Sequence, residues 1–234
     1  MLNPQKLKLY LLAGLSGLLS LSSCDDYSEE VERLTAEQQE LKEEVENLES
    51  EAERLSVFED RMEFLADQLA GLTATIETNH GTMEAEFYQD EAPIHVFNFV
   101  ARAESGFYEG LKFHRVIEDF MIQGGDPNTR GDDRSTYGGG GPVANIPHEF
   151  NDISHEPGVL SMARVSDVTQ GAGSQFFVMH GEVPRLDGEY TVFGRLTTGE
   201  ETLESIATTE TYGEDSEYRD QPVEDVIIER IVVE

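Results

Sequence analysis

The sequence has a single cysteine and few basic residues. Because Cys24 has no second cysteine to pair with, an intramolecular disulfide is excluded. Lysine and arginine together number 16, against 48 aspartates and glutamates, which gives a formal net charge of −32 at pH 7. Such a surface repels a polyanion, so nucleic acid is excluded as a partner.

Motifs of several metal, phosphate and nucleophile sites are missing as well. The six histidines lack the i, i+4 spacing of a zinc-binding helix, and no Asp-x-Asp-x-Asp-Gly loop for calcium is present. The glycines at 138–141 are not followed by the Gly-Lys-Ser/Thr of a phosphate loop, so we expect them to form a loop close to a groove. Ser161 and Ser174 lie in no nucleophile-elbow motif.

The acidic charge is spread over the whole chain. It amounts to −13 in residues 25–70 and −21 in residues 71–234, so it is a property of the entire protein and not of one tail. Lysine occurs only at positions 6, 8, 42 and 112, whereas arginine is retained. This composition resembles that of proteins from salt-loving organisms, in which salt screens the repulsion between surface charges.

Residues 1–23 have the features of a secretory signal peptide. They contain no acid, and Lys6 and Lys8 precede an apolar run from Leu9 to Leu21. The run is too short to cross a bilayer core, which takes about 20 apolar residues as a helix. A basic segment followed by a short apolar segment is instead typical of an export signal.

The signal ends in Leu-Ser-Ser-Cys at residues 21–24, which resembles the bacterial lipobox. In that motif the cysteine is lipidated and becomes the mature N-terminus. The resemblance implies that Cys24 anchors the protein to a membrane of the bacterial cell envelope, on its periplasmic or surface side. The alternative is an ordinary signal peptide followed by a free thiol.

After an acidic linker at 24–30, residues 31–70 are predicted to form a helical stalk. Five or six heptads exceed the three or four that indicate a coiled coil, and no proline or glycine interrupts them before Gly71. The d row is regular and the a row is weak. The d positions are Leu34, Leu41, Leu48, Leu55, Met62 and Leu69, and the a positions are Val31, Gln38, Val45, Ala52, Glu59 and Ala66.

The flanking e and g positions of these heptads are mostly glutamate. Glu37 can pair with Lys42 across an interface, but Glu44 would face Glu49. We therefore expect a homo-oligomer through residues 31–70 that is weakened by repulsion at low salt. The alternatives are a single amphipathic helix packed on its own domain and an acidic spacer.

Residues 71–234 are long enough for one sizeable core and are predicted to be mainly β. Short apolar segments alternate with glycine-rich turns, which favours an antiparallel barrel or sandwich. Helices are expected from Ala92-Pro93 to a stop at Gly106 and from Glu200 to Ala207. Strands are expected at 73–78, 82–88, 111–117, 120–123, 159–163, 175–179, 191–196 and 226–233.

The most informative motif is Phe-His-Arg-Val-Ile at 113–117, which continues as Phe-Met-Ile-Gln-Gly-Gly-Asp at 120–126. It places one cation beside an aromatic ring, a thioether and an amide on adjacent extended segments. A second block reads Gly-Val-Leu-Ser-Met-Ala at 158–163 and Gly-Ser-Gln-Phe-Phe-Val at 173–178. In order and spacing these blocks resemble the cyclophilin family of peptidyl-prolyl cis-trans isomerases, over about residues 73–234.

The resemblance implies a closed eight-stranded antiparallel barrel capped by two helices, here preceded by the long N-terminal helix. It also implies a reaction that needs no nucleophile, metal or cofactor. Amide resonance opposes rotation of a prolyl bond by about 18–20 kcal/mol, and catalysis requires only that the twisted amide be bound better than the planar forms. A fixed guanidinium can donate to the lone pair that twisting localises on the prolyl nitrogen.

By this resemblance Arg115 is the catalytic cation, and Gln123 holds the substrate carbonyl or positions Arg115. The proline ring would enter a slot formed by Phe120, Met121, Phe177 and Leu186. The remaining substrate-binding residues implied are Ala163, the Arg164 backbone and Gln175 along the groove for residues before the proline, His114 at its rim, and Tyr190.

Two positions depart from many family members. Arg185 stands where they have tryptophan, a position tied in the family to tight binding of cyclosporin, so this substitution bears on inhibitor affinity more than on activity. Tyr190 stands where they have histidine, and its hydroxyl can still donate. Arg164, often asparagine, and a longer loop at 165–172 resemble the bacterial branch of the family.

Together these features predict a lipid-anchored envelope isomerase that acts on proline-containing polypeptide segments. The predicted parts are a signal at 1–23, a linker at 24–30, a stalk at 31–70 and an isomerase domain at 71–234. A rival hypothesis is a non-catalytic chaperone or scaffold that binds proline segments, and another is a structural spacer. The presence of Arg115 favours the enzyme, because a binding module has no need of that cation.

Overall fold

The computed structural model describes residues 24–142 and 144–234, so the expected signal at 1–23 lies outside the described residues. The chain divides between Phe58 and Glu59 into two compact units. Over the described ranges, no helix is both long and apolar enough to cross a membrane.

The first long element is the helix α2, Cys24–Leu69, which confirms the predicted N-terminal helix. It begins earlier than expected, because residues 24–30, predicted as an acidic linker, are helical. Acidic residues near a helix N-terminus interact favourably with the helix dipole, and no proline or glycine interrupts this segment.

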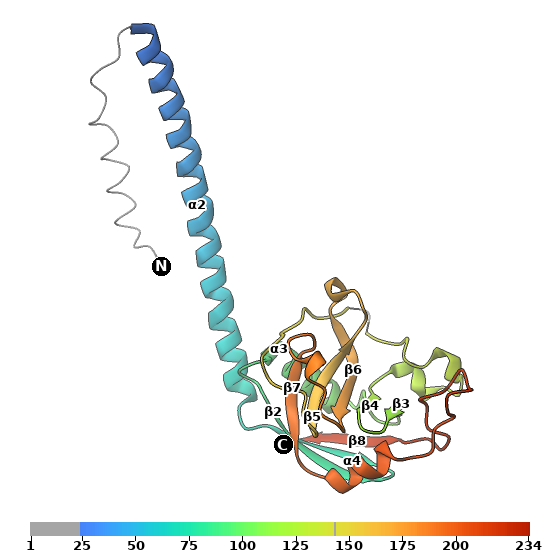
Figure 1. Cartoon of the computed structure of the whole chain (residues 1–234). Coiled ribbons are helices and arrows are strands. Elements are labelled where there is room, and N and C mark those ends of the chain that lie inside the picture. Colours follow the sequence, from blue (N-terminus) through green and yellow to red (C-terminus); the bar gives the residue numbers. More distant parts are fainter. Residues whose placement is uncertain (1–23, 143) are drawn as a thin grey trace. The chain divides into compact units, whose positions relative to one another are not determined.

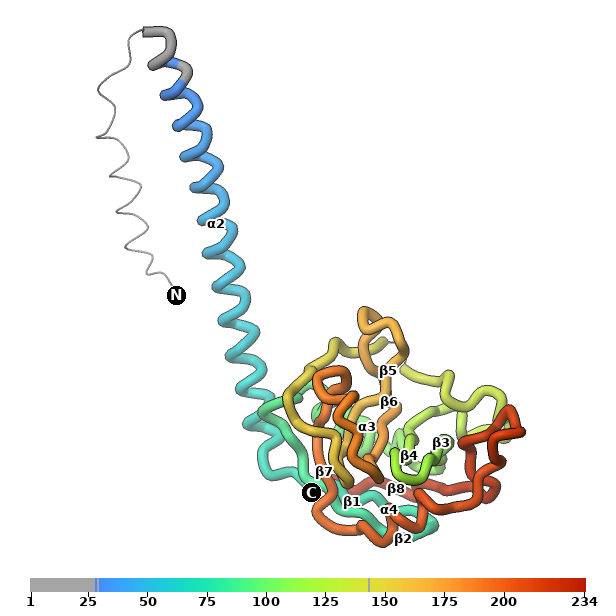
Figure 2. The backbone as a smooth tube through the Cα atoms, viewed as in Figure 1, coloured from blue at the N-terminus to red at the C-terminus, as the bar shows by residue number. Residues whose placement is uncertain are grey.

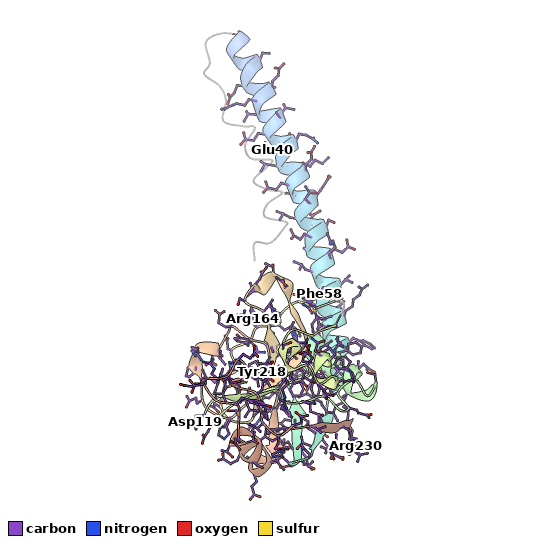
Figure 3. All side chains as sticks on the ribbon, turned by 90° about the vertical axis from the view of Figure 1, so that its right-hand side faces the viewer. Glu40, Phe58, Asp119, Arg164, Tyr218 and Arg230 are labelled. Atoms are coloured by element: carbon purple, nitrogen blue, oxygen red, sulfur yellow. The ribbon has the colours of Figure 1, made fainter. Side chains whose placement is uncertain are left out.

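The environment of the d row changes along α2. Leu34, Leu41, Leu48 and Leu55 are exposed by 40% to 57%, and side chains project from the helix along its length (Figure 3). In the last turns, by contrast, Leu69 is buried in the core of the second unit. That unit therefore begins at Glu59, earlier than the predicted boundary at 70/71, because the apolar face of these last turns packs on the β domain.

The second unit is built on one eight-stranded sheet (Figures 1 and 2). The strand order is β3-β4-β6-β5-β7-β2-β1-β8, and every neighbouring pair is antiparallel. The strands are β1 Thr73–Thr78, β2 Gly81–Phe87, β3 Arg115–Ile117, β4 Met121–Gly124, β5 Val159–Arg164, β6 Ala172–Met179, β7 Val192–Thr198 and β8 Ile228–Val233.

The sheet curls until its two edges meet, which confirms the predicted barrel. The contact that closes the barrel is only a few residues long. It lies just before β3 and β8, where Lys112 and Ile227 form an antiparallel bridge. On either side of it, the Phe113 amide donates to the Val226 carbonyl at 2.9 Å and the Ile228 amide donates to the Leu111 carbonyl at 2.8 Å. The strand predicted at 111–117 is therefore split between this closure and β3.

Along the strands, side chains that face the core alternate with side chains that face the surface. In β2, Met83, Ala85 and Phe87 are buried while Glu84 and Glu86 between them are exposed, as expected for a strand with one face inside a barrel.

Two helices cover the barrel, as predicted. The helix α3, Pro93–Glu104, contacts β6, β7 and β8, and α4, Glu200–Ala207, contacts β2, β3 and β4. Proline suits the first turn of α3, and the Glu149 carboxylate accepts the Ile94 and His95 amides at 3.0 and 2.9 Å. Phe99 on α3 is fully buried at the centre of an aromatic cluster with Phe87, Tyr108, Phe176 and Phe193.

Candidate active site

Three neighbouring strands bring the predicted catalytic residues into one row. Arg115 on β3 pairs with Gln123 on β4, and Gln123 pairs with Phe177 on β6. Directly opposed residues of antiparallel strands project on the same face of a sheet. The register therefore places a cation, an amide and an aromatic ring side by side.

A relay of amide groups fixes the orientation of Gln123. The Gln175 Nε2 group donates to the Gly138 and Gly140 carbonyls at 3.0 and 2.7 Å, so the Gln175 Oε1 atom faces the other way. That oxygen accepts from Gln123 Nε2 at 2.9 Å, which turns Gln123 Oε1 toward Arg115. Arg115 Nη1 donates to this oxygen at 3.5 Å. The Gln123 side chain therefore lies between Gln175 and Arg115, in contact with both.

The Arg115 guanidinium lies beside the ring of Phe120. Its Cζ atom is 5.8 Å from the centroid of that ring, and the Arg185 Cζ atom is 5.7 Å from the same centroid. Arg185 therefore places a second cation beside the Phe120 ring. Arg115 also lies 3.4 Å, through Nε, from Asp220 Oδ2, an ion pair that sequence analysis did not find.

Hydrogen bonds hold the turn that carries Phe120 to residues 180 and 181, which follow β6. The Phe120 carbonyl accepts from the His180 and Gly181 amides at 2.9 and 3.1 Å, and the Asp119 amide donates to His180 Nδ1 at 3.0 Å. A Cβ atom at Gly181 would lie 2.0 Å from the Asp119 carbonyl oxygen, so only glycine allows this close approach.

The predicted slot residues form one apolar cluster separate from the barrel core. Met121, Phe177 and Leu186 belong to it together with Val159, Met179 and Val192. Phe120, Ala163 and Tyr190 are partly buried against this cluster. We refer to Phe120, Met121, Phe177 and Leu186 as the proline slot.

A groove of about 420 Å³ continues from Gln123 along Ala163, Arg164 and Gln175, as predicted. Its other wall is the glycine segment 138–141, which confirms that this segment lies close to the groove. The buried Asp126 carboxylate accepts the Gly138 and Gly140 amides and so holds the segment in place. The backbone carbonyls of this wall are those that orient Gln175.

Arg164 contributes more than its backbone. Its side chain folds over Tyr190, with Cζ 4.6 Å from the ring centroid, and its Nε donates to the Glu189 carbonyl at 2.8 Å. Tyr190 in turn meets the Phe177 ring edge to face at 5.6 Å. The tyrosine therefore forms a side wall of the slot.

His114 was predicted to stand at the rim of the groove. It is instead almost fully buried, at 5% exposure, although it still lines the hollow beside Arg115 and Gln123. Neighbouring residues of an extended segment point to opposite sides, so the exposure of Arg115 directs His114 inward. Burial lowers the pKa of His114 to about 4, so its imidazole is neutral at pH 7. Neither ring nitrogen has a hydrogen-bond partner among the described residues.

A buried histidine that the sequence analysis missed supports the loop bearing Leu186 and Tyr190. The His155 Nδ1 and backbone amide lie 2.9 and 2.8 Å from Asp187 Oδ1. The backbone hydrogen bond from His155 lowers the pKa of Asp187, and burial lowers the pKa of His155. These residues are 32 positions apart and carry no motif, so only the fold brings them together.

Comparisons with known proteins match most of the β domain. The family described as cyclophilin type peptidyl-prolyl cis-trans isomerase matches residues 73–233. A peptidyl-prolyl cis-trans isomerase of Synechococcus elongatus is 45% identical over 133 residues, covering 57% of this chain and 85% of that protein. A peptidyl-prolyl cis-trans isomerase-like 2 protein of Cryptococcus neoformans is 42% identical over 161 residues, but the match covers 68% of this chain and only 27% of that protein.

Solved structures share the fold. A cyclophilin type peptidyl-prolyl cis-trans isomerase of Cryptosporidium parvum, whose structure was determined in the presence of the dipeptide Ala-Pro, superposes with a TM-score of 0.61 at 33% identity. The superposition covers 69% of this chain and 98% of that structure.

Proposed function

This chain belongs to the cyclophilin-type peptidyl-prolyl cis-trans isomerase family, and from this premise we propose that it catalyses prolyl isomerisation in proteins of the cell envelope. The observation that carries the proposal is the fixed guanidinium of Arg115 at the edge of the proline slot. A cation beside a slot for an apolar ring has the chemistry that a twisted prolyl amide requires.

Arg115 would stabilise the transition state by hydrogen bonding. Rotation about the prolyl bond breaks amide resonance and leaves a lone pair on the nitrogen, to which an N–H of the guanidinium donates. A thousandfold acceleration requires about 4 kcal/mol of differential binding. One or two charge-assisted hydrogen bonds in a partly dry site are sufficient for this.

The proline slot would hold the ring while the preceding residues turn. Met121, Phe177 and Leu186 are each less than 10% exposed and present only apolar atoms beside the ring site. Gln123 and the groove beside Gln175 would hold the peptide before the proline. The proline ring and the residues before it would thus be bound at two separate places. Rotation is then confined to the prolyl amide bond that joins them.

A chromogenic prolyl-peptide assay tests this proposal against the rival of a non-catalytic proline-binding module. An isomerase accelerates exchange at protein concentrations far below that of the peptide, because each molecule turns over many times. A binding module would leave the exchange rate unchanged under those conditions, and that result would exclude catalysis.

For the N-terminus we propose lipidation of Cys24 and anchoring to an envelope membrane. The support is the signal-like sequence at 1–23 followed by the chain's single cysteine at the lipobox position. An anchored isomerase would act on clients that emerge at the same membrane.

We predict that Cys24→Ser releases the protein from the membrane fraction or leaves its signal uncleaved, because the hydroxyl cannot form the thioether to the lipid. Mass spectrometry of the mature N-terminus, with fractionation of cells, measures both effects. An unmodified Cys24 in the wild-type protein, or cleavage at another position, would contradict the anchor.

We further propose that the exposed d row of α2 is a self-association seam, supported by the exposure of Leu34, Leu41, Leu48 and Leu55. The helix carries many glutamates beside this row, so two copies repel each other at low salt. Raising the ionic strength shortens the Debye length from about 10 Å at 0.1 M to about 3 Å at 1 M.

The chain from residue 25 onward is therefore predicted to shift from monomer to oligomer as salt rises, as measured by sedimentation. Leu48→Asp, at the centre of the d row, should abolish the shift without changing isomerase activity. The matched variant Glu40→Asp preserves charge and should behave like the wild type. A chain that stays monomeric at molar salt would reduce the segment to a spacer.

A further inference from the structure

Arg115 is contacted on one side by Gln123 of the paired strand and on the other by Asp220, which is 105 positions away in sequence. A guanidinium carries five N–H donors, and two of its nitrogens are engaged here: Nε with Asp220 at 3.4 Å and Nη1 with Gln123 at 3.5 Å. Within the described ranges, Nη2 makes no hydrogen bond and remains available to a substrate. Two contacts on a planar group, even at these long distances, favour one direction and one tilt of its plane.

Asp220 is itself held firmly against β3. Its backbone carbonyl accepts from the Val116 amide at 2.8 Å, next in sequence to Arg115. Its other carboxylate oxygen, Oδ1, lies 3.2 Å from Nε of Arg219. Each oxygen of the carboxylate thus faces a different guanidinium, and its side chain is only 24% exposed.

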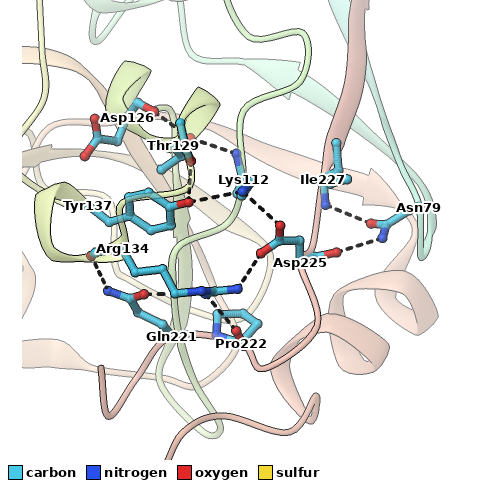
Figure 4. A network of polar contacts seen from close by, with 11 residues as sticks. Asn79, Lys112, Asp126, Thr129, Arg134, Tyr137, Gln221, Pro222, Asp225 and Ile227 are labelled. Atoms are coloured by element: carbon cyan, nitrogen blue, oxygen red, sulfur yellow. Dashed lines mark hydrogen bonds and ion pairs between the residues drawn. The ribbon is translucent and has the colours of Figure 1, made fainter. Parts of the chain in front are cut away.

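The loop that carries Asp220, residues 211–222, is braced from outside the active site (Figure 4). Arg134 donates to the Pro222 carbonyl at 3.1 Å and pairs with Asp225 at 2.6 Å, while Gln221 Nε2 donates back to the Arg134 carbonyl. Lys112 pairs with the second oxygen of Asp225 at 2.8 Å. A carboxylate on a braced loop can hold a cation in one orientation.

We infer that Asp220 is a positioning residue, which pre-orients the Arg115 guanidinium so that its Nη2 edge faces the prolyl amide. The inference rests on the proposed function of Arg115. Its physical basis is preorganisation: a cation aimed before the substrate twists loses no further entropy in the transition state. Because Arg219 pairs with the other oxygen of the same carboxylate, the negative charge of Asp220 is shared between two guanidinium groups.

The role requires a hydrogen-bond acceptor at residue 220 more than a negative charge. Asp220→Asn keeps an oxygen that can accept from Nε, whereas Asp220→Ala removes it. Asp215 is exposed on the same loop and provides a matched control. Asp215→Ala also removes one negative charge, but the acidic partner of Arg115 is Asp220 and not Asp215.

The test compares kcat and KM for a prolyl peptide in the full chain and its variants. Asp220→Ala is expected to lower kcat by about tenfold with KM little changed, Asp220→Asn to stay within about threefold, and Asp215→Ala to match the wild type. In an Arg115→Ala background, Asp220→Ala should have no further effect, because the group it positions is gone. Equal thermal midpoints would show that the variants are folded.

A wild-type rate in Asp220→Ala, or a further loss in the double variant, would overturn the positioning role. The NMR signal of the Arg115 Nε–H group gives a second measure that does not depend on turnover. We expect it to exchange slowly in the wild type and rapidly in Asp220→Ala, and an unchanged signal would contradict the inference. A wild-type chain without turnover would instead refute the proposed function, while this signal still decides the role of Asp220.

Discussion

Arg115→Ala is expected to lower kcat/KM by about a hundredfold or more, equivalent to about 2.7 kcal/mol of transition-state stabilisation. The loss follows because no other described cation contacts Gln123, the amide beside the proline slot. Arg115→Lys should also lose most activity, since an ammonium group on a flexible chain cannot contact Asp220 and Gln123 with the same planar geometry.

The control for Arg115→Ala is Arg195→Ala, which removes an exposed arginine whose partner is Glu86 on the outside of the barrel. Activity in this variant should equal that of the wild type. If Arg115→Ala is folded and retains wild-type kcat/KM, the proposed mechanism is wrong even if the protein is an isomerase.

Phe99→Ala should have the largest effect on stability. Phe99 is fully buried, and its ring lies within 5.7 Å, centroid to centroid, of four other aromatic rings. Truncating a buried phenylalanine costs about 3–5 kcal/mol, because transfer energy is lost and a cavity is left. That is a large fraction of the free energy of unfolding of a typical domain, which is about 5–15 kcal/mol.

Urea denaturation of the chain from residue 25 onward measures this loss. Phe97→Ala is the matched control, since Phe97 lies on the same helix, α3, and is 51% exposed. Its effect should stay within about 0.5 kcal/mol. Comparable losses at both positions would show that the aromatic cluster is not the centre of the core.

Local signals in the sequence located most of the fold. Pro93 marked the start of α3, and the alternation of Met83, Ala85 and Phe87 with glutamates marked β2, because each depends on neighbours only a few residues away. The end of the stalk was less predictable. The heptad of α2 continues unbroken to Leu69, and nothing in its spacing distinguishes a seam for another helix from a face that packs on the barrel.

The candidate site was predictable where residues of one motif lie on paired strands. Arg115 and Gln123 are eight positions apart, and a hairpin brings them together. Asp220 is 105 positions from Arg115, and its contact depends on closure of the barrel near β3. The burial of His114 was not predicted, because the motif identifies the residues but not the face of the strand on which each side chain lies.

Prolyl isomerisation by this protein is proposed to depend on Arg115. NMR exchange spectroscopy measures this dependence on an Ala-Pro peptide, with the chain from residue 25 onward present at a concentration far below that of the peptide. Uncatalysed exchange takes tens to hundreds of seconds. With the wild-type chain we expect exchange about a thousandfold faster than this, and with Arg115→Ala we expect the acceleration to be lost. If the wild-type chain leaves the exchange rate equal to that of the peptide alone, the protein is not a prolyl isomerase.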